Sequence, residues 1–276
     1  MTHNTDYVPP RVWTWDQPSG GEFANINRPI AGATHDKALP VGKHPFQLYS
    51  LATPNGQKAS ILFEELLEKG HRGAEYDAWP IRIGEGDQFG SGFVAINPNS
   101  KIPALVDHSG PEPVRVFESG AILLYLAGKT GRFIPADPRT RMQCIEWLFW
   151  QMASLGPMTG QYGHFHTYAP EKIPYAMERY RNEAERLLGV LNTRLRGREF
   201  IVGDEYSIAD MACYPWISPY SKAPLDLTPF PDVQRWHAAI AQRPATQRAY
   251  ERGASLRREG PMTDEEKKIL FGQRAR

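Results

Sequence analysis

The chain has 276 residues, a formal net charge of +1, and a composition of 41% hydrophobic and 23% charged residues. This length suits one large domain or two small ones with a real hydrophobic core. Because the charges nearly balance, we expect no strong electrostatic attraction to nucleic acid or to an anionic membrane surface. The two cysteines lie far apart in sequence and do not indicate a disulfide framework.

Residues 1–44 are the first predicted segment, an irregular extension in which proline and glycine recur. The extension also contains Trp13, Trp15 and Phe23, whereas freely solvated tails are usually poor in aromatic residues. We therefore expect it to lie against the body of the protein or against a partner subunit. The chain opens without an apolar stretch, and no later stretch is long and apolar enough to span a bilayer. This predicts a cytoplasmic protein rather than a membrane protein.

An α/β unit of about 85 residues is expected next. Residues 46–51 alternate like a short strand, and a helix should then begin at Pro54. Thr53 suits the N-cap of this helix, because its side chain can accept a backbone hydrogen bond, and Pro54 suits the first helical position. Gly70 is expected to end the helix.

Three more strands and a second helix complete the predicted unit. The strands fall within 75–83, 104–107 and 114–117, and a glycine-rich loop at 84–92 follows the first of them. The second helix covers 119–129, with Ser119 as its cap and Gly131 as its end. On the first helix, Glu64 and Glu65 are expected to face solvent.

The rest of the chain is predicted to be all-helical after a linker at 135–138. Apolar residues at helical spacing predict helices around 142–152, 173–195 and 233–241. Ser207-Ile208-Ala209-Asp210 has the form of a capping box in front of a buried helix. The predicted organisation is therefore an extension at 1–44, an α/β domain at 45–131, an all-helical domain at 139–252 and a solvated tail at 253–276.

Five short motifs, in this order, resemble the cytosolic glutathione transferase family. They are Thr53-Pro54-Asn55, Ser100-Lys101-Ile102-Pro103-Ala104-Leu105, Phe117-Glu118-Ser119-Gly120, Ser207-Ile208-Ala209-Asp210 and Arg243-Pro244-Ala245. Each motif alone is a weak signal, but together they span most of the chain. The resemblance implies a thioredoxin-like N-terminal domain that binds glutathione, followed by a helical C-terminal domain, and it implies a homodimer.

The subtype is indicated by further segments. Val12–Asp16, Phe23–Pro29 and Tyr76–Trp79 resemble the bacterial nu class of this family. That class is known for reducing disulfides with glutathione rather than mainly conjugating electrophiles. The resemblance therefore implies glutathione as the bound co-substrate and small-molecule or peptide disulfides as partners.

The position after the first strand limits the chemistry of such a site. A thioredoxin-like redox site would carry Cys-x-x-Cys there, whereas this chain has Thr53-Pro54-Asn55-Gly56. If the site does thiol chemistry, the sulfur must arrive with a ligand. A helix N-terminus favours an anion, and the Thr53 hydroxyl and the Asn55 amide can each donate a hydrogen bond to a thiolate. We expect these two residues to be catalytic by stabilising the thiolate; otherwise they only begin the helix.

The resemblance also implies contacts with glutathione for several other residues. Pro103 matches a proline that is cis in the family, so that the main chain of Ile102 pairs with the cysteinyl part of glutathione. Ser119 would hold the γ-glutamyl carboxylate, and Glu118 would face the γ-glutamyl ammonium. The remaining candidate contacts are Asn27, Pro54, Gln88, Lys101 and Arg179.

Several other reactive side chains are expected to be structural. His164 and His166 have no further metal-ligating residues near them in sequence, so no metal is expected. Cys144 and Cys213 are each predicted to be buried in a helix, and Tyr49 is predicted to pack as a strand residue.

Three functions remain open from the sequence. The first is a dimeric disulfide reductase that uses two glutathione molecules, or glutathione disulfide, at each site. Without Cys-x-x-Cys, a second glutathione is needed to resolve the mixed disulfide. The second is a transferase that conjugates glutathione to electrophilic small molecules. The third is a non-catalytic binding or scaffold protein that keeps the fold.

Overall fold

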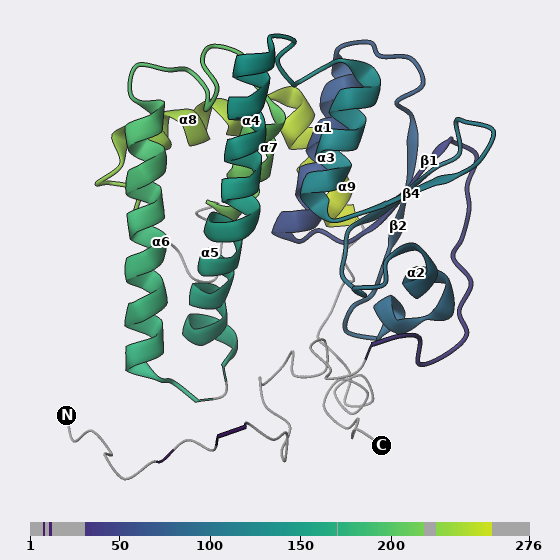
Figure 1. The fold of residues 1–276 in the computed structure, drawn as a ribbon, viewed down its shortest axis with the longest axis horizontal. Coiled ribbons are helices and arrows are strands. Elements are labelled where there is room, and N and C mark those ends of the chain that lie inside the picture. The colour runs from purple at the N-terminus through teal and green to yellow at the C-terminus, as the bar shows by residue number, and fades with distance from the viewer. Residues whose placement is uncertain (1–7, 9–10, 13–30, 170, 218–224, 256–276) are drawn as a thin grey trace.

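In the computed structural model, the structure describes residues 8, 11–12, 31–169, 171–217 and 225–255. The expectations for Trp13, Trp15, Phe23 and Asn27, and those for the tail beyond residue 255, lie outside these residues. Figure 1 shows a sheet with its helices on one side of the molecule and a group of long helices on the other. No helix within the described ranges combines the length and the apolar character that crossing a bilayer requires.

A four-stranded sheet in the order β2-β1-β3-β4 forms the α/β part. Its strands are β1 (Phe46–Ser50), β2 (Tyr76–Pro80), β3 (Ala104–Asp107) and β4 (Val114–Phe117), each within the range predicted for it. β1 pairs in parallel with β2 and antiparallel with β3, which pairs antiparallel with β4. All of β1 is buried because it lies between two strands and is covered on both faces, whereas β4 is an exposed edge strand.

The two helices that were predicted for this unit begin and end close to the predicted positions. α1 (Pro54–Glu68) has Thr53 as its N-cap, and the Thr53 hydroxyl oxygen accepts a hydrogen bond of 3.2 Å from the Gly56 backbone nitrogen. α3 (Ser119–Thr130) ends at Gly131, which has a φ of 65°. The prediction of Ser119 as its cap is wrong by one residue: the N-cap is Glu118, and Ser119 is the first helical residue.

The prediction of a loop over 84–92 is also wrong in part. This stretch contains a short 3-10 helix, η2 (Asp87–Phe89), and the start of α2 (Ser91–Ile96). The glycines at its end allow a close approach of backbones: a Cβ atom on Gly92 would lie 2.7 Å from the Lys37 carbonyl oxygen. The backbone nitrogen of Ser91 donates to the His35 carbonyl at 2.9 Å, so the described end of the extension does lie against the body.

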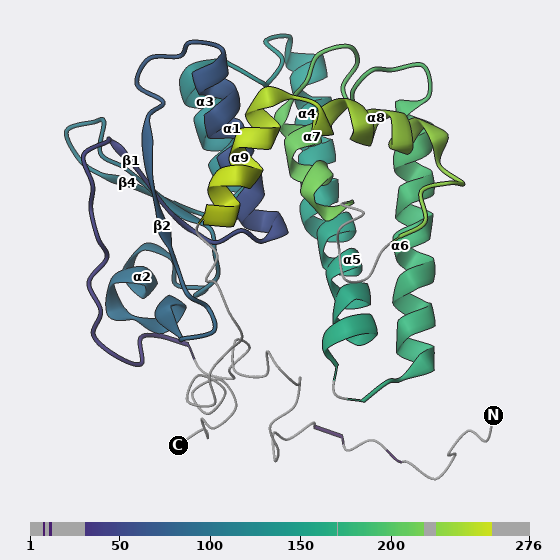
Figure 2. The same ribbon diagram turned by 180° about the vertical axis from the view of Figure 1, so that it is seen from behind.

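The helical part is built on one long helical path followed by shorter helices. The path runs through α4 (Pro138–Trp150), the π-helix η3 (Gln151–Leu155), α5 (Gly156–Gly163) and the π-helix η4 (His164–Tyr168). After it come α6 (Pro174–Leu195), α7 (Ile208–Cys213), η5 (Tyr214–Trp216), α8 (Pro231–Ala241) and α9 (Pro244–Ser255). α5 was not predicted, because three glycines interrupt its apolar pattern. Figure 2 shows α9 lying along α1.

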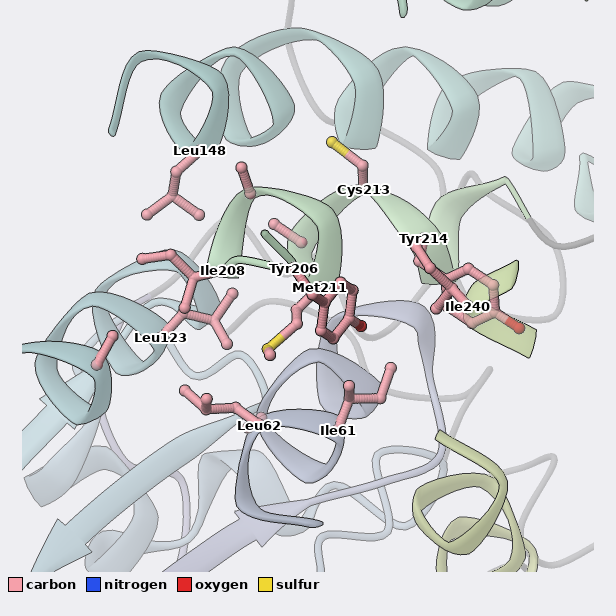
Figure 3. Close-up of a cluster of buried hydrophobic side chains, with 14 of the residues drawn as sticks. Ile61, Leu62, Leu123, Leu148, Tyr206, Ile208, Met211, Cys213, Tyr214 and Ile240 are labelled. Atoms are coloured by element: carbon pink, nitrogen blue, oxygen red, sulfur yellow. The ribbon is translucent and has the colours of Figure 1, made fainter. Parts of the chain in front are cut away.

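One hydrophobic core joins the two parts. α1 and α3 cover one face of the sheet, and their apolar side chains pack against α7. Figure 3 shows Ile61 and Leu62 of α1 and Leu123 of α3 in one cluster with Ile208 and Met211 of α7. The opposite face of the sheet has its own smaller core around Tyr49 and Phe93, so Tyr49 is packed as predicted.

Buried polar groups fix the helical part to α1. The predicted capping box is present, because the Asp210 carboxylate accepts from the Ser207 backbone nitrogen at 3.0 Å and Ser207 caps α7.

Glu64 and Glu65 were predicted to face solvent, but both are buried. Arg243 binds Glu65 through two hydrogen bonds of 2.5 and 2.8 Å, and Arg248 lies 3.2 Å from Glu64. The prediction failed because α9 covers this face of α1, a long-range contact that a helical pattern does not contain.

Candidate functional site

A cleft of about 600 Å³ lies between the α/β part and the helical part. Its size is in the range that holds small-molecule ligands. Six of the predicted site residues line it: Asn55, Lys101, Ile102, Pro103, Glu118 and Ser119. They come from α1, from the loop before β3 and from the start of α3, so the fold brings together motifs that are up to about sixty residues apart.

The loop before β3 presents Ile102 at the cleft. The Ile102–Pro103 peptide bond is cis, as the family resemblance predicted. Asn97 holds this loop through two hydrogen bonds. Its side-chain amide donates to the Lys101 carbonyl oxygen, and its backbone carbonyl oxygen accepts from the Ser100 backbone nitrogen at 3.0 Å. The main chain of Ile102 is therefore held beside the cleft by buried polar contacts.

The start of α3 supplies the next wall. Glu118 has a φ of 70° and is exposed, whereas Ser119 is buried. A left-handed conformation is uncommon outside glycine, and such residues often cluster at binding sites. Because Ser119 is the first helical residue, the unpaired backbone N–H groups of α3 and its hydroxyl lie at one place in the cleft.

Asn55 is oriented by a residue that sequence analysis missed. Trp216, from η5 in the helical part, donates its indole N–H to the Asn55 side-chain oxygen at 3.0 Å. With its oxygen occupied, the Asn55 amide has its two N–H groups available to the cleft.

The same tryptophan explains one glycine of α5. A Cβ atom on Gly160 would lie 3.3 Å from the Trp216 ring, whereas one on Gly156 would lie 2.7 Å from the Gln151 side-chain nitrogen. Gly160 therefore makes room for the indole ring, and Gly156 makes room for the Gln151 side chain. No local sequence signal links Trp216 to Asn55, which is 161 positions away.

The remaining predicted residues lie elsewhere or outside the description. Thr53 and Pro54 do not line the cleft but immediately precede Asn55 at the start of α1. Gln88 is buried, donates to the Ile83 carbonyl oxygen at 3.2 Å and is not among the lining residues. Arg179 is exposed on α6 and does not line the cleft.

Sequence analysis also missed the floor of the cleft. Lys58 of α1 is fully buried there and donates to the Gln151 side-chain oxygen at 2.6 Å. Gln151 and Met152 are the first two residues of the π-helix η3, a local widening that often occurs at functional sites. A signal was available for Lys58, because it follows Asn55 by one helical turn and so shares its side of α1.

The chain itself offers no reactive thiol in the cleft. Its two cysteines, Cys144 and Cys213, are both buried in helices, and neither lines the cleft. Burial raises the pKa of the Cys144 thiol, and it raises the pKa of Cys213 well above the ordinary value. Both stay protonated and behave as small apolar groups. Within the described residues, no group of three or more potential ligands could hold a metal ion.

Comparison with known proteins matches both parts of the chain. Residues 45–128 match the glutathione S-transferase N-terminal domain, and residues 157–244 match the glutathione S-transferase C-terminal domain. The chain is 57% identical to the disulfide-bond oxidoreductase YghU of Escherichia coli (strain K12), over 90% of this chain and 88% of that protein.

Solved structures agree with this match. The glutathione transferase YghU from Streptococcus pneumoniae, complexed with glutathione, has a TM-score of 0.85 and 47% identity, covering 89% of this chain and 97% of that one. A glutathione transferase from Burkholderia graminis has two glutathione molecules bound per subunit. Its TM-score is 0.71 and its identity 45%, covering 75% of this chain and 88% of that one. With both of its parts matched, the chain belongs to the glutathione S-transferase family.

Proposed function

We propose that this protein is a glutathione-dependent disulfide reductase that uses two glutathione molecules at each cleft. The observation that carries the proposal is that donors surround the start of α1 while both cysteines of the chain are buried elsewhere. The cleft therefore suits a ligand that brings its own sulfur. The relatives support the same reading, since one is named a disulfide-bond oxidoreductase and another binds two glutathione molecules per subunit. We place this activity in the cytoplasm.

The proposed reaction balances with glutathione as the only reductant. The thiolate of the first glutathione attacks one sulfur of the substrate disulfide, which forms a mixed disulfide and releases the other sulfur as a thiolate that takes up a proton. The thiolate of the second glutathione attacks the glutathione sulfur of that mixed disulfide. Glutathione disulfide is formed, and the second substrate sulfur leaves as a thiol. Two glutathione thiols are oxidised, and one substrate disulfide is reduced.

The protein's own part in this reaction is to keep the attacking sulfur ionised and in place. The N-terminus of α1 carries a partial positive charge and unpaired N–H groups that favour a thiolate. The Thr53 hydroxyl oxygen accepts from Gly56, which leaves its hydrogen for a ligand, and the Asn55 amide offers two more. On the proposed binding mode, Ile102 pairs its backbone with the peptide, Ser119 holds the γ-glutamyl carboxylate and Glu118 faces the ammonium.

Replacing the thiolate donors should slow disulfide reduction. We expect Asn55→Ala to lower kcat/KM on a small soluble disulfide by about tenfold or more, because a hydrogen bond to a charged group contributes about 1.5–3 kcal/mol. Thr53→Ala should lower it further, whereas Thr53→Ser, which keeps the hydroxyl, should retain most of the activity. Steady-state rates with the disulfide and with an aryl halide are measured side by side. Unchanged rates in both alanine variants, or faster turnover of the aryl halide by the parent protein, would contradict the proposal.

The contact between Trp216 and Asn55 gives a second prediction. Trp216→Phe keeps an aromatic ring but removes the indole donor, so the Asn55 amide loses its anchor. We expect kcat/KM for disulfide reduction to fall about fivefold, the effect of one ordinary hydrogen bond of about 1 kcal/mol. In the Asn55→Ala background the same change should have almost no further effect, since the two residues act as one unit. Trp147→Phe, on α4 and away from the cleft, is the control. Additive losses in the double variant would show that Trp216 acts independently of Asn55.

We also propose that the protein is a homodimer. Met142 and Phe149 are seven residues apart on α4, so they share one face, and both are exposed, as are Val114 and Phe117 on the edge strand β4. Large exposed apolar side chains on a folded protein often mark an interface. Light scattering should give twice the monomer mass for the parent protein, and Phe149→Glu should shift the mass toward the monomer. A monomeric parent protein at micromolar concentration would contradict this assignment.

A further inference from the structure

Lys58 is an ammonium group buried without a charged partner. Its side chain has 0% relative exposure, although it lines the cleft at the floor beneath Ser119. Among the residues that the structure describes, no carboxylate lies within ion-pair distance of its nitrogen. Since burying an unpaired charge is costly, such a lysine is rarely kept for packing alone.

The acceptors around the Lys58 ammonium are all uncharged, and two of the three are weak or distant. Its Nζ atom lies 2.6 Å from the Gln151 side-chain oxygen, 3.3 Å from the Ser119 hydroxyl oxygen and 3.4 Å from the Met152 sulfur. A thioether is a weak acceptor, so of the three N–H bonds of the ammonium only two meet oxygen, one of these at the long end of hydrogen-bond distance. The ammonium therefore has capacity for a stronger acceptor from the cleft.

A group beside Lys58 lacks an acceptor altogether. Gln151 is fully buried and lines the cleft, and its side-chain nitrogen has no hydrogen-bond partner among the described residues. A buried polar atom without a partner is uncommon and calls for a specific explanation. Together, Lys58 and Gln151 present donors and a positive charge at one end of the cleft, which is the complement of a carboxylate.

The charged surroundings of Lys58 are limited. The titratable groups close enough to influence Lys58 are Glu118, at the N-cap of α3, and Cys213, on α7. Lys101 lines the same cleft. The Cys213 thiol is neutral because burial raises its pKa. The π-helix η3 contributes no ionisable side chain. Desolvation is therefore the main influence, and it lowers the pKa of Lys58 to about 7, while the Glu118 carboxylate acts in the opposite direction.

From this geometry we propose that Lys58 supplies the buried positive charge that binds the γ-glutamyl carboxylate of glutathione, with the Gln151 amide as a second donor. The inference rests on the proposed function, since it assigns a residue to the glutathione that this function requires.

Lys58 would also orient the Ser119 hydroxyl. The Ser119 oxygen accepts from Lys58, so its hydrogen must point elsewhere, and the present acceptor is the Met152 sulfur at 3.6 Å. A carboxylate is a far stronger acceptor than a thioether and would take this hydrogen bond. Lys58 is thus both a binding residue and a positioning residue for Ser119.

The sign of the pH dependence follows from the two states of Lys58. In the free protein the pKa is about 7, so at pH 8 most molecules carry a neutral amine there. A bound carboxylate favours the ammonium and raises this pKa, so binding at pH 8 takes up a proton from solvent. At pH 6 Lys58 is already charged, so binding takes up only a small fraction of a proton. Affinity should therefore fall as pH rises above about 7, with a slope approaching tenfold per pH unit.

The experiment is calorimetric titration of the full chain with S-methylglutathione, which has no thiol to ionise. Titrations at pH 6 and at pH 8, each in two buffers that differ in ionisation enthalpy, give the protons taken up on binding. We expect most of one proton per site at pH 8 and little at pH 6. Lys58→Met should abolish the uptake at pH 8 and weaken binding at pH 6 by about tenfold or more. Lys69→Met, at the exposed end of the same helix, should behave like the parent protein.

Two outcomes would overturn this assignment while leaving the proposed function intact. One is binding by the parent protein without proton uptake at pH 8, which decides the question even if Lys58→Met does not fold. The other is the same uptake in a folded Lys58→Met variant, with folding checked by circular dichroism. If the parent protein binds no S-methylglutathione at either pH, both the proposed function and the role of Lys58 are wrong.

Discussion

The chemistry of the cleft depends on the electrostatics at the start of α1. A helix N-terminus favours an anion, and the Thr53 and Asn55 side chains at this terminus are neutral groups that can donate hydrogen bonds. None of these groups can carry electrons or form a disulfide. The two groups in the chain that can, Cys144 and Cys213, are buried in the helical part with raised pKa values. The protein can therefore favour a thiolate at the cleft without supplying one.

The helical part completes the site by reaching across to α1. Trp216 holds the Asn55 amide, Gln151 accepts from Lys58, and Arg243 binds Glu65 through two hydrogen bonds. These contacts surround the apolar packing of α7 against α1 and α3 shown in Figure 3. Because the donors of the cleft are oriented from both parts, the geometry of the site depends on how the two parts pack together. A ligand in the cleft would in turn add contacts to both.

Local signals in the sequence were sufficient for much of the fold. Thr53 and Pro54 start α1, Gly131 ends α3 and Ser207 with Asp210 caps α7, because caps depend on only a few neighbouring residues. Features that depend on distant contacts were missed. Gly92 marks a close backbone approach to Lys37 rather than a loop, and Gly160 of α5 makes room for Trp216.

The residues of the candidate site also fall into some that short motifs predicted and some that they did not. Motif resemblance predicted Asn55, Ile102 and Ser119 as site residues, and these three line one cleft. It did not indicate Lys58. The helical spacing from Asn55 places Lys58 on the same side of α1, but buried lysines are too rare for its burial to be expected from that spacing. Motif resemblance also placed Gln88 and Arg179 with the ligand, although neither lines the cleft in the described structure.

Intact mass spectrometry of the protein, acid-quenched during turnover of a disulfide with glutathione, tests the origin of the reactive sulfur. If the sulfur comes only from the ligand, no covalent intermediate with the protein forms, and the protein keeps its unmodified mass at every time point. A glutathione or substrate adduct on Cys144 or Cys213 that appears and decays at the rate of turnover would show that the protein supplies the reactive sulfur.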